Sequence, residues 1–232
     1  MKKYVLLFLV TGLAKASFSQ TDSLYFAATL DTRTPTEASD PLFNGREHVN
    51  YHPSIEGNPY YFTTDWQKGN LVYRDILYKD VFLKYDLAAD EVVVRHINGF
   101  TGVVLFTPRI RTFTLGDKLF VTLAGDDRSV IKTGLYEQLV KGNLSLYARR
   151  SRLLEEKIVS AVLEQKFVNN DSYYLLKEGK YYPVKKESAL LELTGERRGE
   201  IKAWMKASGI KFKKNREAAM VSIVEHYNQL SR

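Results

Sequence analysis

Residues 81–97 read VFLKYDLAADEVVVRHI, and this stretch decides the fold. Apolar side chains at every second position from 81 to 87 alternate with Lys84 and Asp86, and a period of two is typical of a β-strand. We therefore expect one buried face, with Lys84 and Asp86 on a solvated one. Ala88-Ala89-Asp90 turns the chain into a second strand, 91–97. The segment predicts an antiparallel hairpin.

Further hairpins are expected on both sides of this one. From about Tyr60 to Tyr147, short β-branched and aromatic runs are separated by turn residues such as Asn98-Gly99 and Gly116-Asp117. Residues 173–184 predict another hairpin around Lys177-Glu178-Gly179. The pattern favours an antiparallel β-meander, as an open curved sheet or a partly closed barrel.

The C-terminal part predicts three helices, over 188–194, 196–208 and 215–230, with Asn215 as the N-cap of the last. Residues 151–168 fit helix and strand patterns about equally, and a helix is slightly favoured. The fold class is therefore α+β, a meander followed by a small three-helix unit. The expected parts are a signal peptide (1–19), an irregular arm (20–59), the β-domain (60–150), a connecting segment with a hairpin (151–184) and a basic helical unit (185–232).

The first residues predict export. Lys2 and Lys3 precede an apolar run from 4 to 14, and Ser17-Phe18-Ser19 offers small residues for cleavage before Gln20, with Ala14-Lys15-Ala16 as the alternative. The chain has no cysteine. Lipoprotein attachment, disulfides and thiolate metal sites are therefore excluded, and we expect location in the periplasm or at the outer membrane.

Basic charge is concentrated in the last third of the chain. Residues 16–140 carry 12 Lys and Arg against 16 Asp and Glu, whereas 141–232 carry 19 against 11. This asymmetry suggests peripheral contact of the C-terminal helices with an anionic surface, although basic helix faces also serve solubility alone. Export removes nucleic acid as a partner.

Five segments carry a resemblance: 42–47, 51–61, 81–94, 173–184 and 211–215. Together they resemble a family of exported Bacteroidota proteins that has no assigned activity. The resemblance covers nearly the whole chain after the leader. It implies a Gram-negative envelope location and transfers no catalytic residues.

Four aromatic residues lie close together at the start of the predicted β-domain. Tyr60, Tyr61, Phe62 and Trp66 could stack a sugar ring or anchor a partner protein, because Tyr and Trp combine large contact area with a polar group. The alternative is that they cover the open edge or the end of the sheet.

Two other sets of residues are weaker candidates for a catalytic or metal site. Asp86, Asp90 and Glu91 surround one turn, where paired carboxylates can act as acid and base, but acidic residues are also ordinary in turns. His48 and His52 have the spacing of a zinc pair, but Pro53 and Gly57 place them in a loop. We expect no cofactor.

The sequence thus predicts an exported envelope protein that binds another envelope protein or an outer-membrane component and is not an enzyme. The alternatives are an exported hydrolase that uses the acidic turn and a β-barrel carrier of a small apolar ligand.

Overall fold

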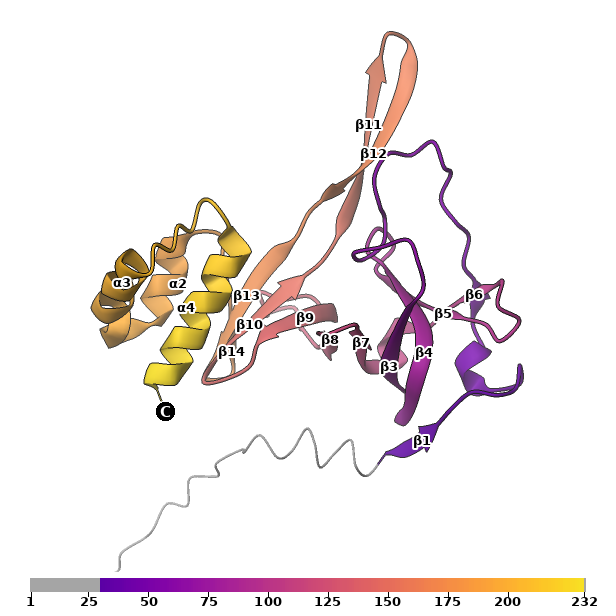
Figure 1. Cartoon of the computed structure of the whole chain (residues 1–232), viewed down its shortest axis with the longest axis horizontal. Helices are drawn as coiled ribbons and strands as arrows, with labels where there is room; N and C mark the ends of the chain where they lie inside the picture. The colour runs from indigo at the N-terminus through magenta and orange to yellow at the C-terminus, as the bar shows by residue number, and fades with distance from the viewer. Residues whose placement is uncertain (1–29, 232) are drawn as a thin grey trace, which may run out of the picture. The chain divides into compact units, whose positions relative to one another are not determined.

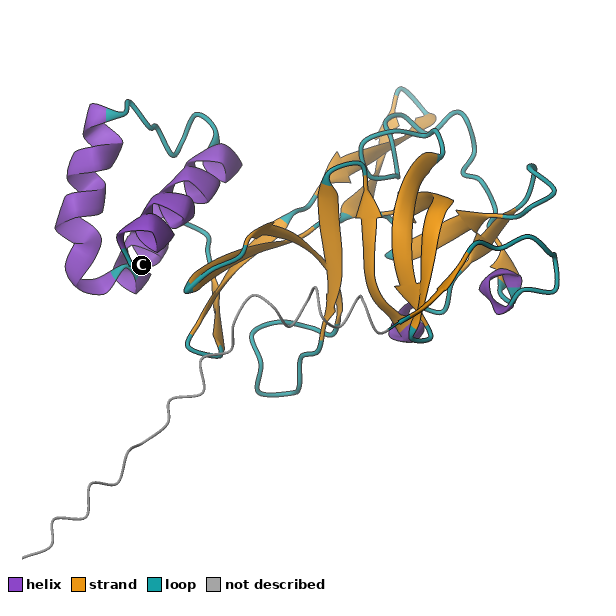
Figure 2. Ribbon diagram, turned by 60° about the horizontal axis from the view of Figure 1, so that its bottom comes forward, coloured by secondary structure: helices purple, strands orange, loops and turns teal. Residues whose placement is uncertain are grey.

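A computed structural model of the chain describes residues 30–231. It confirms the predicted class: mostly antiparallel strands in one large sheet, followed by three C-terminal helices (Figure 1; Figure 2). The predicted signal peptide, residues 1–19, lies outside the described residues. No helix within 30–231 is long and apolar enough to cross a membrane.

The large sheet has the strand order β14-β13-β10-β9-β8-β7-β3-β4-β5-β6-β2, and β1 lies parallel to β4 beside this path. Its strands are β1 (Asp31–Arg33), β2 (Arg46–Glu47), β3 (Gln67–Tyr73), β4 (Ile76–Asp86), β5 (Glu91–Arg95), β6 (Gly102–Val104), β7 (Ile110–Leu115), β8 (Lys118–Leu123), β9 (Gly134–Val140), β10 (Leu144–Arg149), β13 (Ser172–Lys177) and β14 (Lys180–Pro183). Because β14 and β2 end the path without meeting, the sheet is open. Of the two predicted forms of the meander, the open curved sheet is therefore confirmed and the partly closed barrel is not.

The hairpin of residues 81–97 forms as β4 and β5, with Tyr85 opposite Val92. The predicted apolar face is confirmed, because Val81, Leu83, Tyr85 and Leu87 are all buried in the main core. The expectation that the opposite face is solvated is wrong at Asp86, which is 0% exposed. The chain before β3 folds over this face: Tyr60 forms a bridge with Asp86, and Leu87 donates its N–H to the Pro59 carbonyl.

Residues with positive φ angles lie in the turns that were predicted from the sequence. Gly116-Asp117 joins β7 to β8, and Gly116 has a φ of 58°. Glu178-Gly179 joins β13 to β14 with φ values of 49° and 77°, as a two-residue hairpin turn requires. Between β5 and β6 the turn is longer than two residues, and only Gly99 of the Asn98-Gly99 pair has a positive φ.

Residues 152–169 form a separate two-stranded ribbon, β11 (Arg152–Val159) and β12 (Val162–Asn169), so the preference for a helix at 151–168 is wrong. Its turn consists of Ser160 and Ala161, both at positive φ. Neither residue is glycine or asparagine, so the sequence gives no turn signal there. The ribbon extends beyond the large sheet (Figure 1).

The C-terminal helices are α2 (Glu187–Leu193), α3 (Arg198–Ala207) and α4 (Arg216–Leu230), close to the predicted ranges. The Asn215 side chain caps α4 by accepting the N–H of Ala218 at 3.2 Å, as predicted. The buried side chains of these helices pack on β9, β10 and β13 and form a second core. Its helix residues with full burial are Leu190, Ile201, Met220, Ile223 and Val224.

A buried polar cluster joins these helices to the sheet. Arg150, which follows β10, donates to Glu137 of β9 at 2.6 Å and to Glu217 of α4 at 2.6 and 3.1 Å. It also donates to Asp171 at 2.8 Å. Since Arg150 is only 9% exposed, its charge is satisfied by these carboxylates and scarcely by water.

Candidate functional site

The candidate site is a pocket of about 270 Å³ between the loop at residues 50–60 and the end of β4. The loop reaches β12, where Glu56 exchanges backbone hydrogen bonds with Gln165 and Phe167, and it returns to β4 at Pro59. Gly57 permits the return, because its φ is 93° and an added Cβ would lie 3.0 Å from the Phe167 carbonyl oxygen. The residues that line the pocket are Asn50, Tyr51, His52, Pro53, Ile55, Gly57, Pro59, Tyr60, Thr64, Lys84 and Phe167.

A buried group of polar side chains supports one wall of this pocket. His48 Nε2 lies 2.8 Å from the Tyr60 hydroxyl oxygen and 4.0 Å from Asp86 Oδ2. The Tyr51 hydroxyl donates to Asp86 Oδ1 at 3.1 Å. Asp86 Oδ1 also accepts the N–H groups of Ala88 and Ala89, so it fixes the β4–β5 turn, whereas Oδ2 is buried without a hydrogen-bond partner among the described residues.

Burial shifts these groups toward their neutral forms. It raises the pKa of Asp86, although the bonds from Ala89 and Tyr51 oppose the shift. It lowers the pKa of His48 despite the nearby Asp86, and it raises the pKa of Tyr60 to about 12. A phenol with such a pKa is a hydrogen-bond donor at neutral pH and no ready nucleophile. The arrangement therefore suits recognition better than covalent catalysis.

Lys84 supplies the positive charge of the pocket. Its ammonium lies 4.6 Å from the centroid of the Trp66 ring and 5.0 Å from that of Tyr60, distances at which cation–π attraction operates. Burial lowers the pKa of Lys84, and Asp65 acts in the opposite direction. Within residues 30–231, no carboxylate forms an ion pair with Lys84.

The four predicted partner-binding aromatics take different positions. Tyr60 lines the pocket and Trp66 lies beside it against Lys84. Tyr61 instead packs edge-on against Phe120 of the core, with ring centroids 4.9 Å apart. Phe62 is 86% exposed at a positive φ of 66°. The structure thus brings two of the four rings together around one lysine.

The three candidate catalytic carboxylates have separate partners. Asp86 belongs to the buried group of the pocket wall, Asp90 accepts from the Tyr85 hydroxyl at 2.6 Å and from Arg149 at 3.2 Å, and Glu91 pairs with Arg46. Each carboxylate thus has donors of its own, although Asp86 Oδ2 has no hydrogen-bond partner among the described residues. Asp86 and Glu91 lie opposite each other in the register of β4 and β5.

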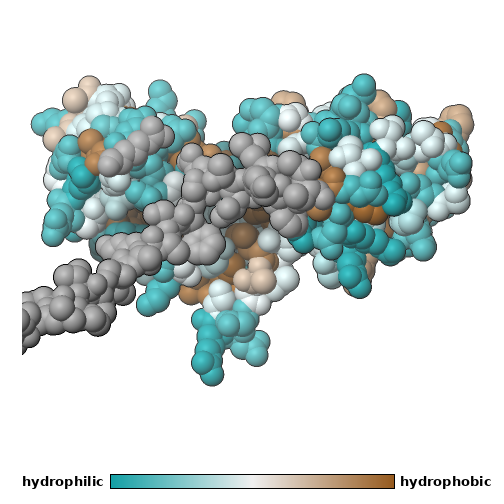
Figure 3. Space-filling view, turned by 90° about the horizontal axis from the view of Figure 1, so that it is seen from below, coloured by the Kyte–Doolittle hydropathy of each residue, from teal (hydrophilic) through white to brown (hydrophobic). Residues whose placement is uncertain are grey.

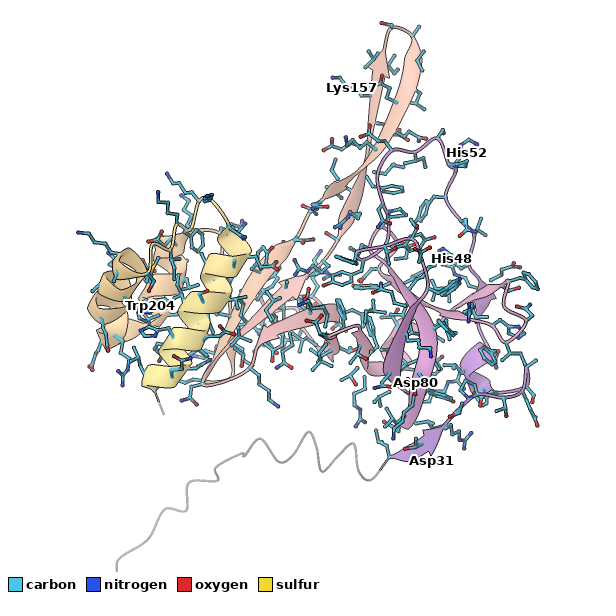
Figure 4. All side chains as sticks on the ribbon, viewed as in Figure 1. Asp31, His48, His52, Asp80, Lys157 and Trp204 are labelled. Atoms are coloured by element: carbon cyan, nitrogen blue, oxygen red, sulfur yellow. The ribbon has the colours of Figure 1, made fainter. Side chains whose placement is uncertain are left out.

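The two candidate metal ligands also separate. His48 lies inside against Tyr60, whereas His52 lies on the outer loop and contacts Ser54 (Figure 4). Within residues 30–231, no three His, Asp or Glu side chains are placed to hold a metal ion.

Sequence reasoning missed Tyr51, Lys84 and Phe167 as pocket residues. Phe167 lies 5.0 Å from the Tyr51 ring, centroid to centroid, although more than a hundred residues separate them. Only the path of the loop to β12 brings them together, and no local motif encodes that path. Lys84 carried a usable signal, because an alternating strand presented it on the same face as Asp86.

The basic helical unit offers a second surface. A hollow of about 570 Å³ lies beside the start of α4 and includes Lys211 and Lys214 among its lining residues. The face of the helices in Figure 3 is mostly hydrophilic. Trp204 of α3 is half-buried and stacks on His226 with ring centroids 4.0 Å apart.

Comparisons with known proteins add no further assignment: no family model, no curated protein and no solved structure matches this chain.

Proposed function

We propose that this chain is an exported binding module of the cell envelope and that its pocket holds a small ring compound with a carboxylate, such as an acidic sugar. The observation that carries the proposal is the Lys84 ammonium, held between the faces of Trp66 and Tyr60 at the pocket. A partly desolvated cation without an ion-pair partner in the described part of the chain attracts an anion strongly.

The remaining lining fits the ring of such a ligand. Tyr51, Tyr60 and Phe167 provide aromatic surface, while Asn50 and Thr64 provide polar groups that can bond hydroxyls. The volume of about 270 Å³ is below the range of ~300–1,000 Å³ for pockets that take drug-sized ligands. A single ring is therefore the favoured size.

The experiment uses the fluorescence of Trp66. The chain has two tryptophans, so Trp204→Phe leaves Trp66 as the only indole, next to the pocket. In this background we expect glucuronate to change the emission with saturation at millimolar concentration or below, and glucose, which lacks the carboxylate, to bind about 10-fold more weakly.

Two lysines on the same strand provide the matched pair of variants. Lys84→Met should abolish the response to glucuronate, whereas Lys79→Met, which removes an exposed charge from β4, should retain it. A response that is equal for glucose and glucuronate, or that survives Lys84→Met, would refute recognition of an anion at this pocket.

The hydrolase alternative and contact of the C-terminal helices with an anionic membrane surface remain secondary proposals. The separate partners of Asp86, Asp90 and Glu91 give the first no support. The second is supported by the lysines near the start of α4. Sedimentation with vesicles that contain anionic phospholipid, against vesicles of neutral phospholipid alone, tests it.

A further inference from the structure

The β11–β12 ribbon exposes a large part of its apolar side chains to solvent. Six of its aliphatic side chains are between 37% and 75% exposed: Leu153, Leu154, Ile158, Val159, Val162 and Leu163. They occur on both faces of the ribbon, because neighbouring strand residues point to opposite sides. Lys157, labelled in Figure 4, lies among them near the end of the ribbon.

The outer edge of β11 is open. Glu155 and Lys157 are among the residues whose backbone groups point toward β12, so those of Leu154, Glu156 and Ile158 point outward. They form no backbone bond with any other described segment. The outer edge of β12, in contrast, is covered near its base by Glu56. A two-stranded ribbon is marginal in water, and an open edge is a template for another strand.

The sequence of β11 is complementary to itself when it is reversed. We propose that β11 pairs with β11 of a second copy of this chain, antiparallel and centred on Glu156, to form a four-stranded sheet across a twofold axis. In this register Leu153 lies opposite Val159 of the second copy, Leu154 opposite Ile158, and Glu155 opposite Lys157. Leu154, Glu156 and Ile158 then exchange backbone hydrogen bonds across the axis.

The pairs within the ribbon extend this match to all four strands. Glu155 pairs with Lys166 and Lys157 with Glu164 in one chain, so the charged row reads Lys166, Glu155, then Lys157 and Glu164 of the second copy, with alternating signs. The apolar rows match in the same way. Val168 and Leu153 meet Val159 and Val162 of the second copy, and on the other face Phe167 and Leu154 meet Ile158 and Leu163.

Neighbouring registers lack this match. Centring on Glu155 would place Leu154 opposite Glu156 and Leu153 opposite Lys157 of the second copy. Centring on Lys157 would place Glu155 opposite Val159. Both registers bury a charge against an aliphatic side chain, which costs free energy. The complementary charges therefore select the pairing on Glu156 and a second copy as the partner.

The central Glu156 pair is the one repulsive contact in this arrangement, because like charges directly opposite each other destabilise a sheet. In one chain, Glu156 accepts a hydrogen bond from the Gln165 side chain at 2.7 Å. Glu156→Gln removes the repulsion and should tighten the dimer about 5-fold at neutral pH. If Glu156 only kept an open edge soluble, Glu156→Gln would instead give aggregates of mixed size, which sedimentation velocity distinguishes from a defined dimer.

Charge reversal combined with sedimentation velocity tests the proposal. The unaltered chain should be a dimer, and Glu155→Lys and Lys157→Glu should each weaken association at least ~10-fold, since each creates two like-charged pairs across the twofold axis. An equimolar mixture of these two variants should dimerise again, because each lysine then faces a glutamate. The double variant Glu155→Lys/Lys157→Glu again has opposite charges across the axis and, where the ribbon forms despite the like charges that it places opposite Lys166 and Glu164, should also dimerise. Glu178→Lys, at the exposed β13–β14 turn, changes the net charge equally and should have no effect.

The outcomes separate clearly. An unaltered chain that stays monomeric up to about 100 μM, single variants that remain dimers, or a mixture that fails to associate would each overturn the proposal. If a charge-reversal variant does not fold, as judged by circular dichroism, Glu156→Gln still decides, because it leaves the pairs Glu155–Lys166 and Lys157–Glu164 of the ribbon unchanged. None of these substitutions touches the lysine of the pocket, so dimerisation and ligand binding are tested independently.

Discussion

His48 Nε2 and the hydroxyl oxygen of Tyr60 lie 2.8 Å apart in the wall of the pocket. The imidazole is 7% exposed, and this burial lowers the pKa of His48 from its ordinary value of 6.5, while Asp86 raises it. We expect a proton-detected titration of the His48 ring to give a pKa below 6.5.

Replacement of the neighbouring carboxylates tests the cause of this shift. Asp86→Asn should lower the pKa of His48 further, because a negative charge that favours the imidazolium is removed. Glu91→Gln should act in the same direction with a smaller effect. In the unfolded chain His48 has its ordinary pKa of 6.5, whereas in the folded chain its pKa is lower. The unfolded state therefore takes up the proton first, and the folded state loses stability as the pH falls below 6.5. A His48 pKa above 6.5 would contradict burial as the dominant effect.

Removal of the buried guanidinium should destabilise the fold strongly. Arg150→Met leaves Glu137, whose side chain is 2% exposed, without its cation, and breaking such a buried pair costs about 3–5 kcal/mol. Urea denaturation would measure the loss. Adding Glu137→Gln should recover part of it. Arg33→Met breaks only the exposed pair with Asp31 and should cost less than about 1 kcal/mol.

Replacement of two glycines by alanine should change the free energy of unfolding in opposite directions. A Cβ on Gly69, at the register shift of β3, would lie 1.9 Å from the Thr114 carbonyl oxygen, so Gly69→Ala should destabilise by about 3 kcal/mol. Nothing lies within 4 Å of the corresponding position at Gly199 in α3. Gly199→Ala should therefore raise the free energy of unfolding by about 0.5–1 kcal/mol. Thermal unfolding of both variants checks this contrast.

Asn228 of α4 binds the end of the β9–β10 hairpin as a neighbouring strand would. Its side chain accepts the Leu144 N–H at 2.9 Å and donates to the Leu144 carbonyl at 2.8 Å. Asn228→Ala should cost about 1–3 kcal/mol, because both groups of a buried residue lose their partner. Hydrogen exchange should show faster exchange of the Leu144 amide. Unchanged protection would mean that water replaces the side chain there.

The regular elements of this fold could be predicted because their signals are local. Alternation at 81–87, turn residues at 116–117 and the cap at Asn215 each specify a structure from adjacent residues, and the structure confirms them. The ribbon at 152–169 could not be assigned, because paired apolar residues at 153–154 and 158–159 satisfy a helix and a strand alike.

The pocket was only partly predictable. Tyr60 and Trp66 were singled out for their aromatic density, but the burial of Asp86 depends on a loop that returns across β4 from more than twenty residues earlier in the chain. A strand pattern alone indicates a solvated side chain wherever a polar residue alternates with apolar ones. It does not indicate which segment later covers that side.

Arg150 connects more than the helices and the sheet. Glu137 also interacts with Tyr61, the residue beside Tyr60 of the pocket, so one guanidinium links the C-terminal unit to the segment that shapes the ligand site. The helices are consequently not an appendage that can be cut away. A chain truncated after Val184 would bare Leu144, Leu146 and Leu175 and leave Arg150 without Glu217, so we expect it to aggregate and to lose the architecture of the pocket as well.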